Sequence, residues 1–254
     1  MTQKFSIKRL DQAAGVLTTS LLLAALVFSL LASSTPIKSL NHAPFKRLQH
    51  GTSSNWSGYA TFGAANTYKS VSASWKQPTV TCATRETSYS SFWVGLDGYN
   101  DSTVEQIGTE ADCYRGHAQY YVWYEMYPRK SFLVTTFLRP GDNVTASVTA
   151  QANSFFSLRL TDSTTGRNYV TTQRLSAAQL SSAEVVAEAP WSGGTLPLAN
   201  FGAASFTNAT ANGQPLGSFN SLDPITMVDP YGMKSTPSAF DSTKANFSVT
   251  WSAS

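Results

Sequence analysis

The chain has 254 residues, of which 42% are hydrophobic, 12% aromatic and only 13% charged. This length suffices for one large domain with an extensive core, as all-β proteins often have. The formal net charge is +3, but the whole positive excess lies before residue 51, and the rest of the chain carries 12 basic against 14 acidic residues. Basic residues do not cluster with aromatic ones, which argues against nucleic acid as a partner.

The N-terminus reads as a targeting segment. Basic residues near the start are followed by a charge-free apolar run over residues 13–32, and Ala32 and Ser34 are small residues spaced as signal peptidase requires. We expect residues 1–34 to be a signal peptide cleaved before Thr35, or an N-terminal membrane anchor if cleavage does not occur. The protein is therefore expected to be secreted, with no membrane contact beyond this segment.

Residues 35–52 are basic, contain two of the three histidines and show no strand-like alternation. We interpret them as a short propeptide or linker that precedes the catalytic domain, residues 53–254. A cluster of basic and titratable side chains suggests that this segment covers an acidic domain until low pH loosens the contact; the cluster comprises Lys38, His42, Lys46, Arg47 and His50.

Cys82 and Cys113 are the only cysteines. In an exported protein two cysteines are expected to form a disulfide rather than remain free. We assign this pair a structural role.

From residue 55 onward, short stretches alternate apolar and polar residues between turn signals, a pattern that predicts many short antiparallel strands. The clearest are Ser70–Trp75, Ala118–Met126, Asn143–Ala150, Phe155–Asp162, Asn168–Thr172, Ala183–Glu188, Ser205–Thr207 and Asn246–Trp251. Apart from a short turn at Ser176–Ser182, no amphipathic helix is evident. We expect an all-β fold, an antiparallel β-sandwich of the concanavalin-like jelly-roll type whose concave face holds an extended polymer.

The sequence lacks the residues that several classes of catalytic mechanism require. After the pro-segment only His117 could supply an imidazole, and we interpret it as a surface or packing residue. A zinc site would require several His or Cys ligands, so we expect no metal and no cofactor. Carboxyl groups remain for acid–base chemistry, with carboxamides as polarising donors.

Five short motifs follow one another along the chain: Asn55–Tyr59 (NWSGY), Phe92–Gly98 (FWVGLDG), Val104–Gly108 (VEQIG), Trp123–Pro128 (WYEMYP) and Ser182–Pro190 (SAEVVAEAP). In this order they resemble the glutamic peptidase family (eqolisin, scytalidoglutamic peptidase-like), whose members share NWxG, WVGxDG, QxG, WYExxP and AExxxE segments. The resemblance extends from Asn55 to Trp251. It implies an endopeptidase that acts on proteins or peptides, and nothing in the sequence indicates more than a monomer.

The resemblance also implies roles for individual residues. The catalytic glutamine falls on Gln106 and the catalytic glutamate on Glu188. Residues that match the substrate cleft are Trp56, Trp93, Asp97, Trp123, Glu125 and Tyr127. Two positions depart from the pattern of some members: Glu110, which we include among the substrate-binding residues, replaces an aspartate, and Met126 replaces a tryptophan.

This pair suits peptide hydrolysis on chemical grounds. One carboxylate can take a proton from water and later return it to the departing amine, while an amide donor stabilises the oxyanion. We expect Glu188 to be the proton shuttle and Gln106 the donor. Activity at low pH would then require hydrogen bonds or nearby dipoles that keep the pKa of Glu188 from rising.

Strand alternation places Glu184 on the same face as Glu188. Glu184 is then either a cleft residue or a solvated residue near the rim. By the same argument Glu125 shares a face with Trp123, for which we favour a role in the substrate groove.

Two other functions remain open at this stage. A glycoside hydrolase on a similar sandwich could use two carboxylates such as Glu125 and Glu188. A non-catalytic carbohydrate-binding module would use the aromatic residues alone.

Overall fold

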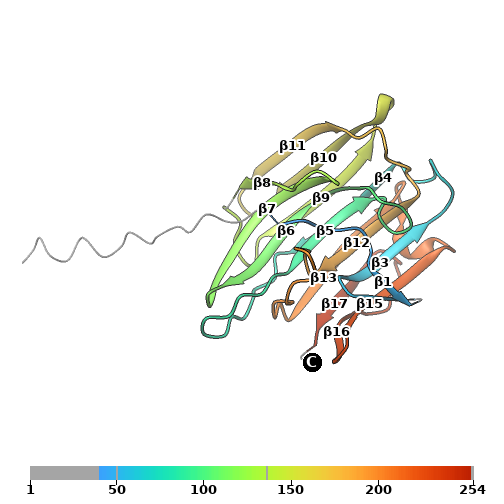
Figure 1. The fold of residues 1–254 in the computed structure, drawn as a ribbon. Helices are drawn as coiled ribbons and strands as arrows, with labels where there is room; N and C mark the ends of the chain where they lie inside the picture. The colour runs from blue at the N-terminus through green and yellow to red at the C-terminus, as the bar shows by residue number, and fades with distance from the viewer. Residues whose placement is uncertain (1–39, 50, 136, 253–254) are drawn as a thin grey trace, which may run out of the picture. The chain divides into compact units, whose positions relative to one another are not determined.

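The computed structural model of the chain describes residues 40–49, 51–135 and 137–252, which form almost exclusively antiparallel β-structure (Figure 1). The expected signal peptide or anchor, residues 1–34, lies outside the described residues. Among the residues that are described, no helix has the length and hydropathy to cross a membrane. The helical segments of this part of the chain are two single 3-10 turns, η1 (Ala152–Ser154) and η2 (Leu216–Ser218).

Sheet I runs in the order β15–β3–β12–β5–β6–β7–β8, and all neighbouring strands in it are antiparallel. Its strands are β3 (Trp56–Phe62), β5 (Ser91–Leu96), β6 (Val104–Tyr114), β7 (His117–Tyr127), β8 (Phe132–Thr135), β12 (Ser182–Glu188) and β15 (Leu222–Asp229).

Sheet II runs in the order β16–β17–β13–β4–β9–β10–β11, again antiparallel throughout. Its strands are β4 (Ser70–Lys76), β9 (Asn143–Ala150), β10 (Phe155–Asp162), β11 (Arg167–Arg174), β13 (Ala203–Ala211), β16 (Gly232–Pro237) and β17 (Phe247–Trp251), with β14 (Gln214–Pro215) paired to β13. Strand β15 links the two sheets because its first half pairs with β3 and its end pairs with β16. The short strands β1 (Arg47–Gln49) and β2 (Thr52–Ser53) pair with each other, and β2 also runs parallel to β15.

One hydrophobic core lies between the two sheets. Successive side chains of a strand point to opposite faces, so every second residue of each sheet enters this core. In β6 and β12 these are the odd-numbered residues, such as Ile107 and Val185, and in β9 they are Val144, Ala146 and Val148. The even-numbered residues of β6 and β12 therefore face away from the core, and they carry the functional groups described below.

The expected all-β sandwich is confirmed. The predicted strands Asn143–Ala150 and Phe155–Asp162 coincide with β9 and β10, and Ala118–Met126 lies within the slightly longer β7. The predicted turn at Ser176–Ser182 is a turn and an irregular segment that leads into β12.

The predicted disulfide is also confirmed: Cys82 and Cys113 are bonded, with their Cα atoms 5.5 Å apart. Cys113 is a buried residue of β6, while Cys82 lies in the loop between β4 and β5. The bond therefore holds that loop against the end of the strand that carries Gln106.

Gly108 offers a test of how tightly sheet I is packed. A Cβ atom there would lie 2.4 Å from the Phe92 carbonyl oxygen and 2.5 Å from the Cβ atom of Trp93. Because a backbone oxygen cannot turn aside, we expect Gly108→Ala to lower the free energy of unfolding by about 1–3 kcal/mol. Urea denaturation measures this loss. Gly194→Ala is the matched control, because nothing lies within 4 Å of that added atom; equal stability of the two variants would contradict the expectation.

Candidate active site

The candidate site lies on the face of sheet I that points away from the core. Strand register arranges its side chains in three rows. The first row is Glu184, Gly95, Gln106 and Glu125; the second is Val186, Trp93, Gly108 and Trp123; the third is Glu188, Ser91, Glu110 and Tyr121. Gln106 and Glu188 are therefore two strands and two rows apart, with β5 between them.

Two glycines make room for an indole ring between these rows. A Cβ atom on Gly95 would lie 2.8 Å from the ring of Trp93, and one on Gly108 would lie still closer to the same residue. The fully buried Trp93 donates its Nε1–H to Glu188 Oε2 at 2.9 Å. Without side chains at these two positions the indole can lie flat over the sheet and reach the carboxyl group.

Gln106 uses both hydrogens of its amide group. Its Nε2 atom donates to Glu125 Oε2 at 3.0 Å and to the backbone carbonyl oxygen of His42 at 2.8 Å. Both partners are acceptors, so the orientation of the amide is determined by its surroundings. Glu125 therefore holds the amide so that its second hydrogen points at a peptide carbonyl.

Glu188 is fully buried and accepts hydrogen bonds at both oxygens. Besides the bond from Trp93, Asn55 Nδ2 donates to its Oε1 atom at 3.4 Å. Burial raises the pKa of Glu188 well above 4.5, and the nearby charge of Glu125 raises it further, while the two donors oppose the shift. Burial prevails, so these hydrogen bonds do not keep the pKa of Glu188 from rising while the site is covered.

Glu110 occupies the same row as Glu188. It accepts a hydrogen bond from Ser91 Oγ at 2.6 Å, and burial raises its pKa well above the usual value, as does the charge of Asp112. Burial also raises the pKa of Asp112, to about 7, although Ser90 and Tyr121 donate hydrogen bonds to it. This end of the site therefore holds protons at acid pH.

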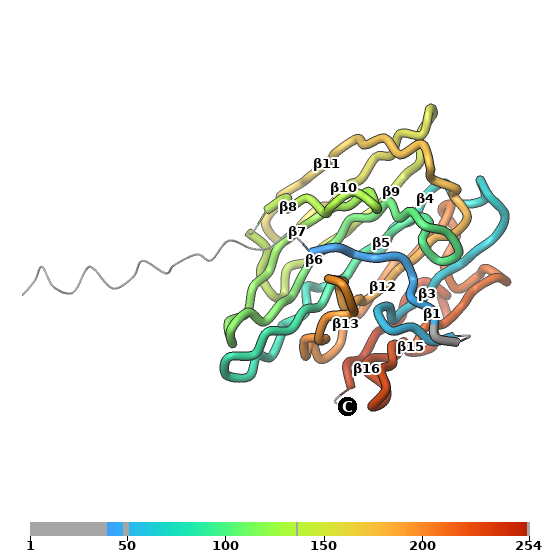
Figure 2. The backbone as a smooth tube through the Cα atoms, in the orientation of Figure 1, coloured from blue at the N-terminus to red at the C-terminus, as the bar shows by residue number. Residues whose placement is uncertain are grey.

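Residues 40–47 lie across these rows, as the blue tube in Figure 2 shows over β6, β5 and β12. The His42 ring stacks on Trp123, with ring centroids 3.5 Å apart and planes 5° from parallel. Its Nε2 atom is 3.3 Å from Glu110 Oε1 and its Nδ1 atom 3.4 Å from Glu188 Oε2. Burial lowers the pKa of His42 well below 6.5. This one residue contacts both Gln106 and Glu188.

The other predicted cleft residues divide into two groups. Trp56 is fully buried and donates its Nε1–H to the carbonyl oxygen of Ala43 at 3.1 Å, so it lies in the site with Trp93, Trp123, Glu110 and Glu125. Tyr127 is the partly exposed last residue of β7, on the same face. Asp97 lies apart: it follows β5 and accepts backbone hydrogen bonds from Gln179, Leu180 and Ser181 at 2.6–2.8 Å.

A second acidic group surrounds Asp97. Glu184 and Glu105 are fully buried, and none of their carboxyl oxygens has a hydrogen-bond partner among the described residues. Of the two alternatives for Glu184, the solvated rim position is therefore wrong. Burial raises the pKa of both groups well above 4.5, and the charge of Asp97 adds to the shift.

Sequence reasoning missed three contacts. Asn55 was noted only as part of a motif, yet it bonds Glu188 and the carbonyl oxygens of Ala43 and Pro44. Ser91 carries no motif signal and is found only from its register opposite Glu110. His42 was assigned to a pro-segment expected to cover the acidic domain, but no local pattern indicated that its ring would contact Glu110 and Glu188.

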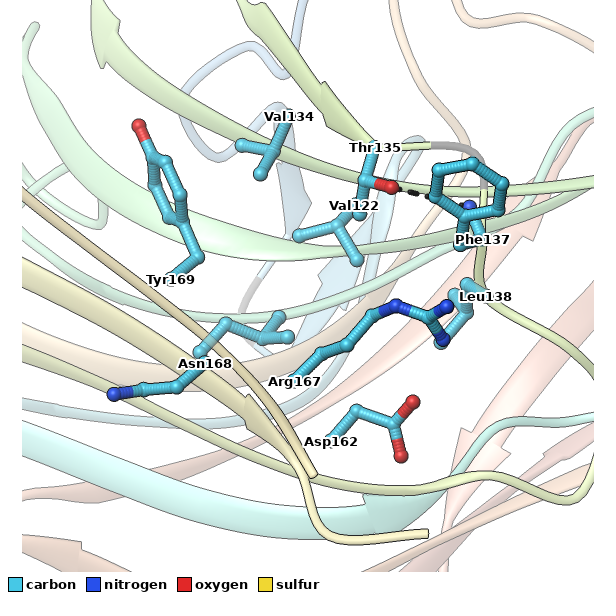
Figure 3. A pocket seen from close by; sticks show the side chains of 10 residues that line it. Val122, Val134, Thr135, Phe137, Leu138, Asp162, Arg167, Asn168 and Tyr169 are labelled. Carbon is cyan, nitrogen blue, oxygen red and sulfur yellow. Dashed lines mark hydrogen bonds between the residues drawn. The ribbon is translucent and has the colours of Figure 1, made fainter. Parts of the chain in front are cut away.

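A separate cavity of about 240 Å³ opens between β7, β8 and β11 (Figure 3). Its lining includes Val122, Leu160 and Tyr169, with the largely exposed Phe137 beside it. Val122 belongs to the core face of β7, whereas Trp123 and Glu125 belong to the other face. This cavity is therefore an opening of the sandwich interior, distinct from the candidate site.

Comparison with known proteins identifies the class. The model of the Peptidase A4 family matches residues 54–250. Scytalido-glutamic peptidase, solved with a peptide-based transition-state analogue, is 24% identical, with 78% of this chain and 98% of that chain covered and a TM-score of 0.66. Aspergilloglutamic peptidase from Aspergillus niger is 26% identical, with 65% of this chain and 99% of that chain covered and a TM-score of 0.57.

A further similar structure is that of SCP-B, a member of the eqolisin family, in complex with the tripeptide Ala-Ile-His. It is 23% identical, covers 78% of this chain and 98% of its own, and has a TM-score of 0.63. A search of curated protein sequences found no significant match.

The β-sandwich and the family match together define a glutamic endopeptidase, an enzyme that hydrolyses peptide bonds. More specifically, the chain belongs to the Peptidase A4 family.

The buried carboxyl groups predict how stability depends on pH. The folded-state pKa of Glu184 is raised above 4.5, so the stability contributed by its protonated form is fully present below pH 4.5 and is lost as pH rises through the folded pKa. We expect the free energy of unfolding to fall as pH rises above about 4.5, and Glu184→Gln to reduce that fall.

Urea denaturation at several pH values measures this slope, with Glu188→Gln present in every protein to prevent self-digestion. Glu86→Gln is the control, because Glu86 is only half-buried in the loop before β5. The slope, not the absolute stability, is the readout, since a buried glutamine has its own cost. An unchanged slope in the Glu184 variant would show that Glu184 ionises normally.

Proposed function

We propose that this protein is a secreted acid endopeptidase in which Gln106 and Glu188 activate water for attack on a peptide bond, without a covalent intermediate. One observation carries the proposal. The Gln106 amide donates to a backbone carbonyl oxygen, that of His42, while Glu188 contacts the side chain of the same residue. A peptide group thus occupies the position that a substrate would take.

Gln106 is the electrophilic group in this mechanism. Its amide donates to the substrate carbonyl oxygen and continues to donate as that oxygen becomes negatively charged, which is how an oxyanion hole accelerates acyl transfer. An amide does not titrate, so the donor is present at any pH. Glu125, at 3.0 Å, orients the amide and accepts the backbone N–H of His42 at 2.9 Å. It is a positioning residue that also binds the peptide.

Glu188 is the general base and then the general acid. Ionised, it takes a proton from the attacking water, and it returns that proton to the nitrogen of the departing amine. Trp93 and Asn55 hold its two oxygens and favour the ionised form. Burial beneath residues 40–47 opposes ionisation, and solvent access after their removal would lower the pKa towards the range that acid catalysis requires.

An acid environment agrees with the protonation of the buried groups. The carboxyl groups of Glu105, Glu110, Glu125 and Glu184 all have pKa values raised by burial, so they are neutral at acid pH. Their neutral forms need no buried cation. In their ionised forms the same groups would repel one another, which favours an enzyme that works in acid.

Secretion is supported by two features. The Cys82–Cys113 disulfide is typical of oxidising compartments. The apolar run at residues 13–32 has the form of a signal peptide, cleaved or retained as an anchor. We further propose that residues 53–254 act as a monomer on proteins or peptides, as the peptide complexes of the structural neighbours suggest.

The test is digestion of a denatured, unmodified protein from about pH 2 to about pH 7 in the presence of an inhibitor of aspartic peptidases. We expect acid-dependent cleavage that the inhibitor does not block. Glu188→Gln and Gln106→Ala should each reduce kcat/KM by at least about 10³-fold, because they remove the base and the oxyanion donor. Gln151→Ala, at an exposed glutamine, is the control.

The same variants distinguish the alternatives. A glycoside hydrolase would tolerate Gln106→Ala and lose activity on polysaccharide with Glu125→Gln. A carbohydrate-binding module would keep its function in Glu188→Gln. Full peptidase activity in the Glu188→Gln variant would refute the proposed mechanism.

A further inference from the structure

The cavity of Figure 3 lies where the edges of the two sheets meet. Strand β8 ends sheet I and β11 ends sheet II, and Figure 1 shows both at the same end of the sandwich. Because β8 has only four residues while β7 beside it has eleven, it covers only part of that edge. The interior between the sheets is therefore open to solvent here, through a cavity of about 240 Å³.

The walls of this cavity are hydrocarbon. Val122, Leu138 and Leu160 belong to the hydrophobic core, yet each keeps 3–5% of its surface exposed. Val134 and Tyr169 are partly buried and pack against the same core. Water gains little in such a space, because it needs several polar partners that these side chains do not offer. The walls therefore suit an apolar group.

The mouth of the cavity carries a positive charge. Arg167, the first residue of β11, extends towards Phe137 and Leu138 (Figure 3), and its guanidinium lies 5.1 Å from the centre of the Phe137 ring. Within the described part of the chain Arg167 forms no ion pair. Phe137 itself is 67% exposed. A cation and an exposed aromatic ring thus stand beside an apolar opening.

Asp162 also lines the cavity and lies opposite Arg167 in the strand register, but its carboxylate is engaged elsewhere. One oxygen accepts the backbone N–H groups of Thr164 at 2.9 Å and Thr165 at 3.2 Å, and the other accepts the Thr165 hydroxyl. These bonds belong to the turn between β10 and β11. The guanidinium of Arg167 therefore remains available to an anion.

The surrounding chain also favours an anion. Residues 128–175, which include β8 to β11, carry six basic residues and only two acidic ones, Asp142 and Asp162. Both acidic residues are buried. The exposed charges of this end of the sandwich are therefore positive, and a positive surface raises the local concentration of anions.

We propose that this cavity binds a medium-chain fatty acid, with the alkyl chain between the sheets and the carboxylate at Arg167. A dry apolar cavity of about 150 Å³ holds benzene. By the same proportion about 240 Å³ holds a chain of about eight to ten carbon atoms. The site lies outside the candidate active site and uses neither Gln106 nor Glu188, so it is independent of the proposed function.

The first experiment is titration calorimetry of the full chain with hexanoate, octanoate and decanoate. It is done at about pH 6, where a carboxylic acid is ionised, with Glu188→Gln in every protein to prevent self-digestion. We expect one molecule to bind per chain. Affinity should rise about three- to fourfold with each CH₂ group, as transfer of that group out of water predicts, and level off at about ten carbons. No binding, or affinity that does not depend on chain length, would overturn the proposal.

A second comparison tests the head group. An exposed ion pair is worth about threefold to fivefold in affinity, so 1-octanol should bind that much more weakly than octanoate. Arg167→Gln should weaken octanoate by the same factor and leave 1-octanol unchanged. Arg159→Gln is the matched control, because Arg159 is an exposed arginine of β10 that does not line the cavity. Equal effects of the two substitutions would refute the role of Arg167.

A third comparison tests the location of the alkyl chain. Val134→Phe fills the cavity and should lower the affinity for octanoate at least about tenfold. Leu133→Phe is its control, since the neighbouring residue on β8 points to the opposite face of the sheet. Octanoate binding that survives Val134→Phe in a folded protein would place the ligand elsewhere. The chain-length series needs no variant of the cavity, so it decides the question even where Val134→Phe fails to fold.

Sedimentation velocity distinguishes a different occupant. A second copy of the chain could cover the same apolar opening, with Phe137 and Phe132 at the contact, since both are more than half exposed. A monomer that binds one octanoate supports the fatty-acid site. A dimer that binds no octanoate and dissociates in Val134→Phe would identify a second copy as the occupant and overturn the proposal.

Discussion

Burial of acid groups without buried cations is the constraint on which the rest of this structure depends. Five of the six glutamates are buried, four of them on the face of sheet I that points away from the core, and no lysine or arginine among the described residues is buried with them. Charged carboxylates without partners are costly when buried, so the covered fold favours carboxyl groups that keep their protons, and the ionised Glu188 of the proposed mechanism depends on solvent access to the site. The composition agrees, because a chain with few charges has few groups that must ionise.

The positions of the proposed catalytic groups depend on two glycines in sheet I as well as on the side chains that its strands carry. Gly95 and Gly108 leave space for Trp93, and Trp93 in turn fixes one oxygen of Glu188. Glu125 on β7, the strand next to that of Gln106, fixes the orientation of the Gln106 amide. Both proposed catalytic groups are thus oriented by residues of other strands, and the rigidity of a hydrogen-bonded sheet preserves these relations between uses.

The sequence predicted the sandwich and many strands because strands such as β9, with one face in the core and one in solvent, alternate visibly. Strands β3 and β5 are buried on both faces, so they show no alternation and were found only as motifs. The family resemblance indicated Gln106 and Glu188. The contacts of Asn55, Ser91 and His42 depend on strand register and on a segment without periodicity, which no local pattern records. Likewise, the backbone partners of Asp97 lie more than eighty residues further along the chain.

The segment over the site crosses the strands of sheet I instead of pairing with an edge strand. Consecutive positions of the bound peptide therefore meet side chains from different strands, such as Trp123 on β7, Gln106 on β6, Glu188 on β12 and Trp56 on β3. Each recognition position is encoded in its own stretch of sequence. Mutation in one strand can then alter the preference at one position of a peptide without disturbing the next, so the specificity of this fold can diverge during evolution one position at a time.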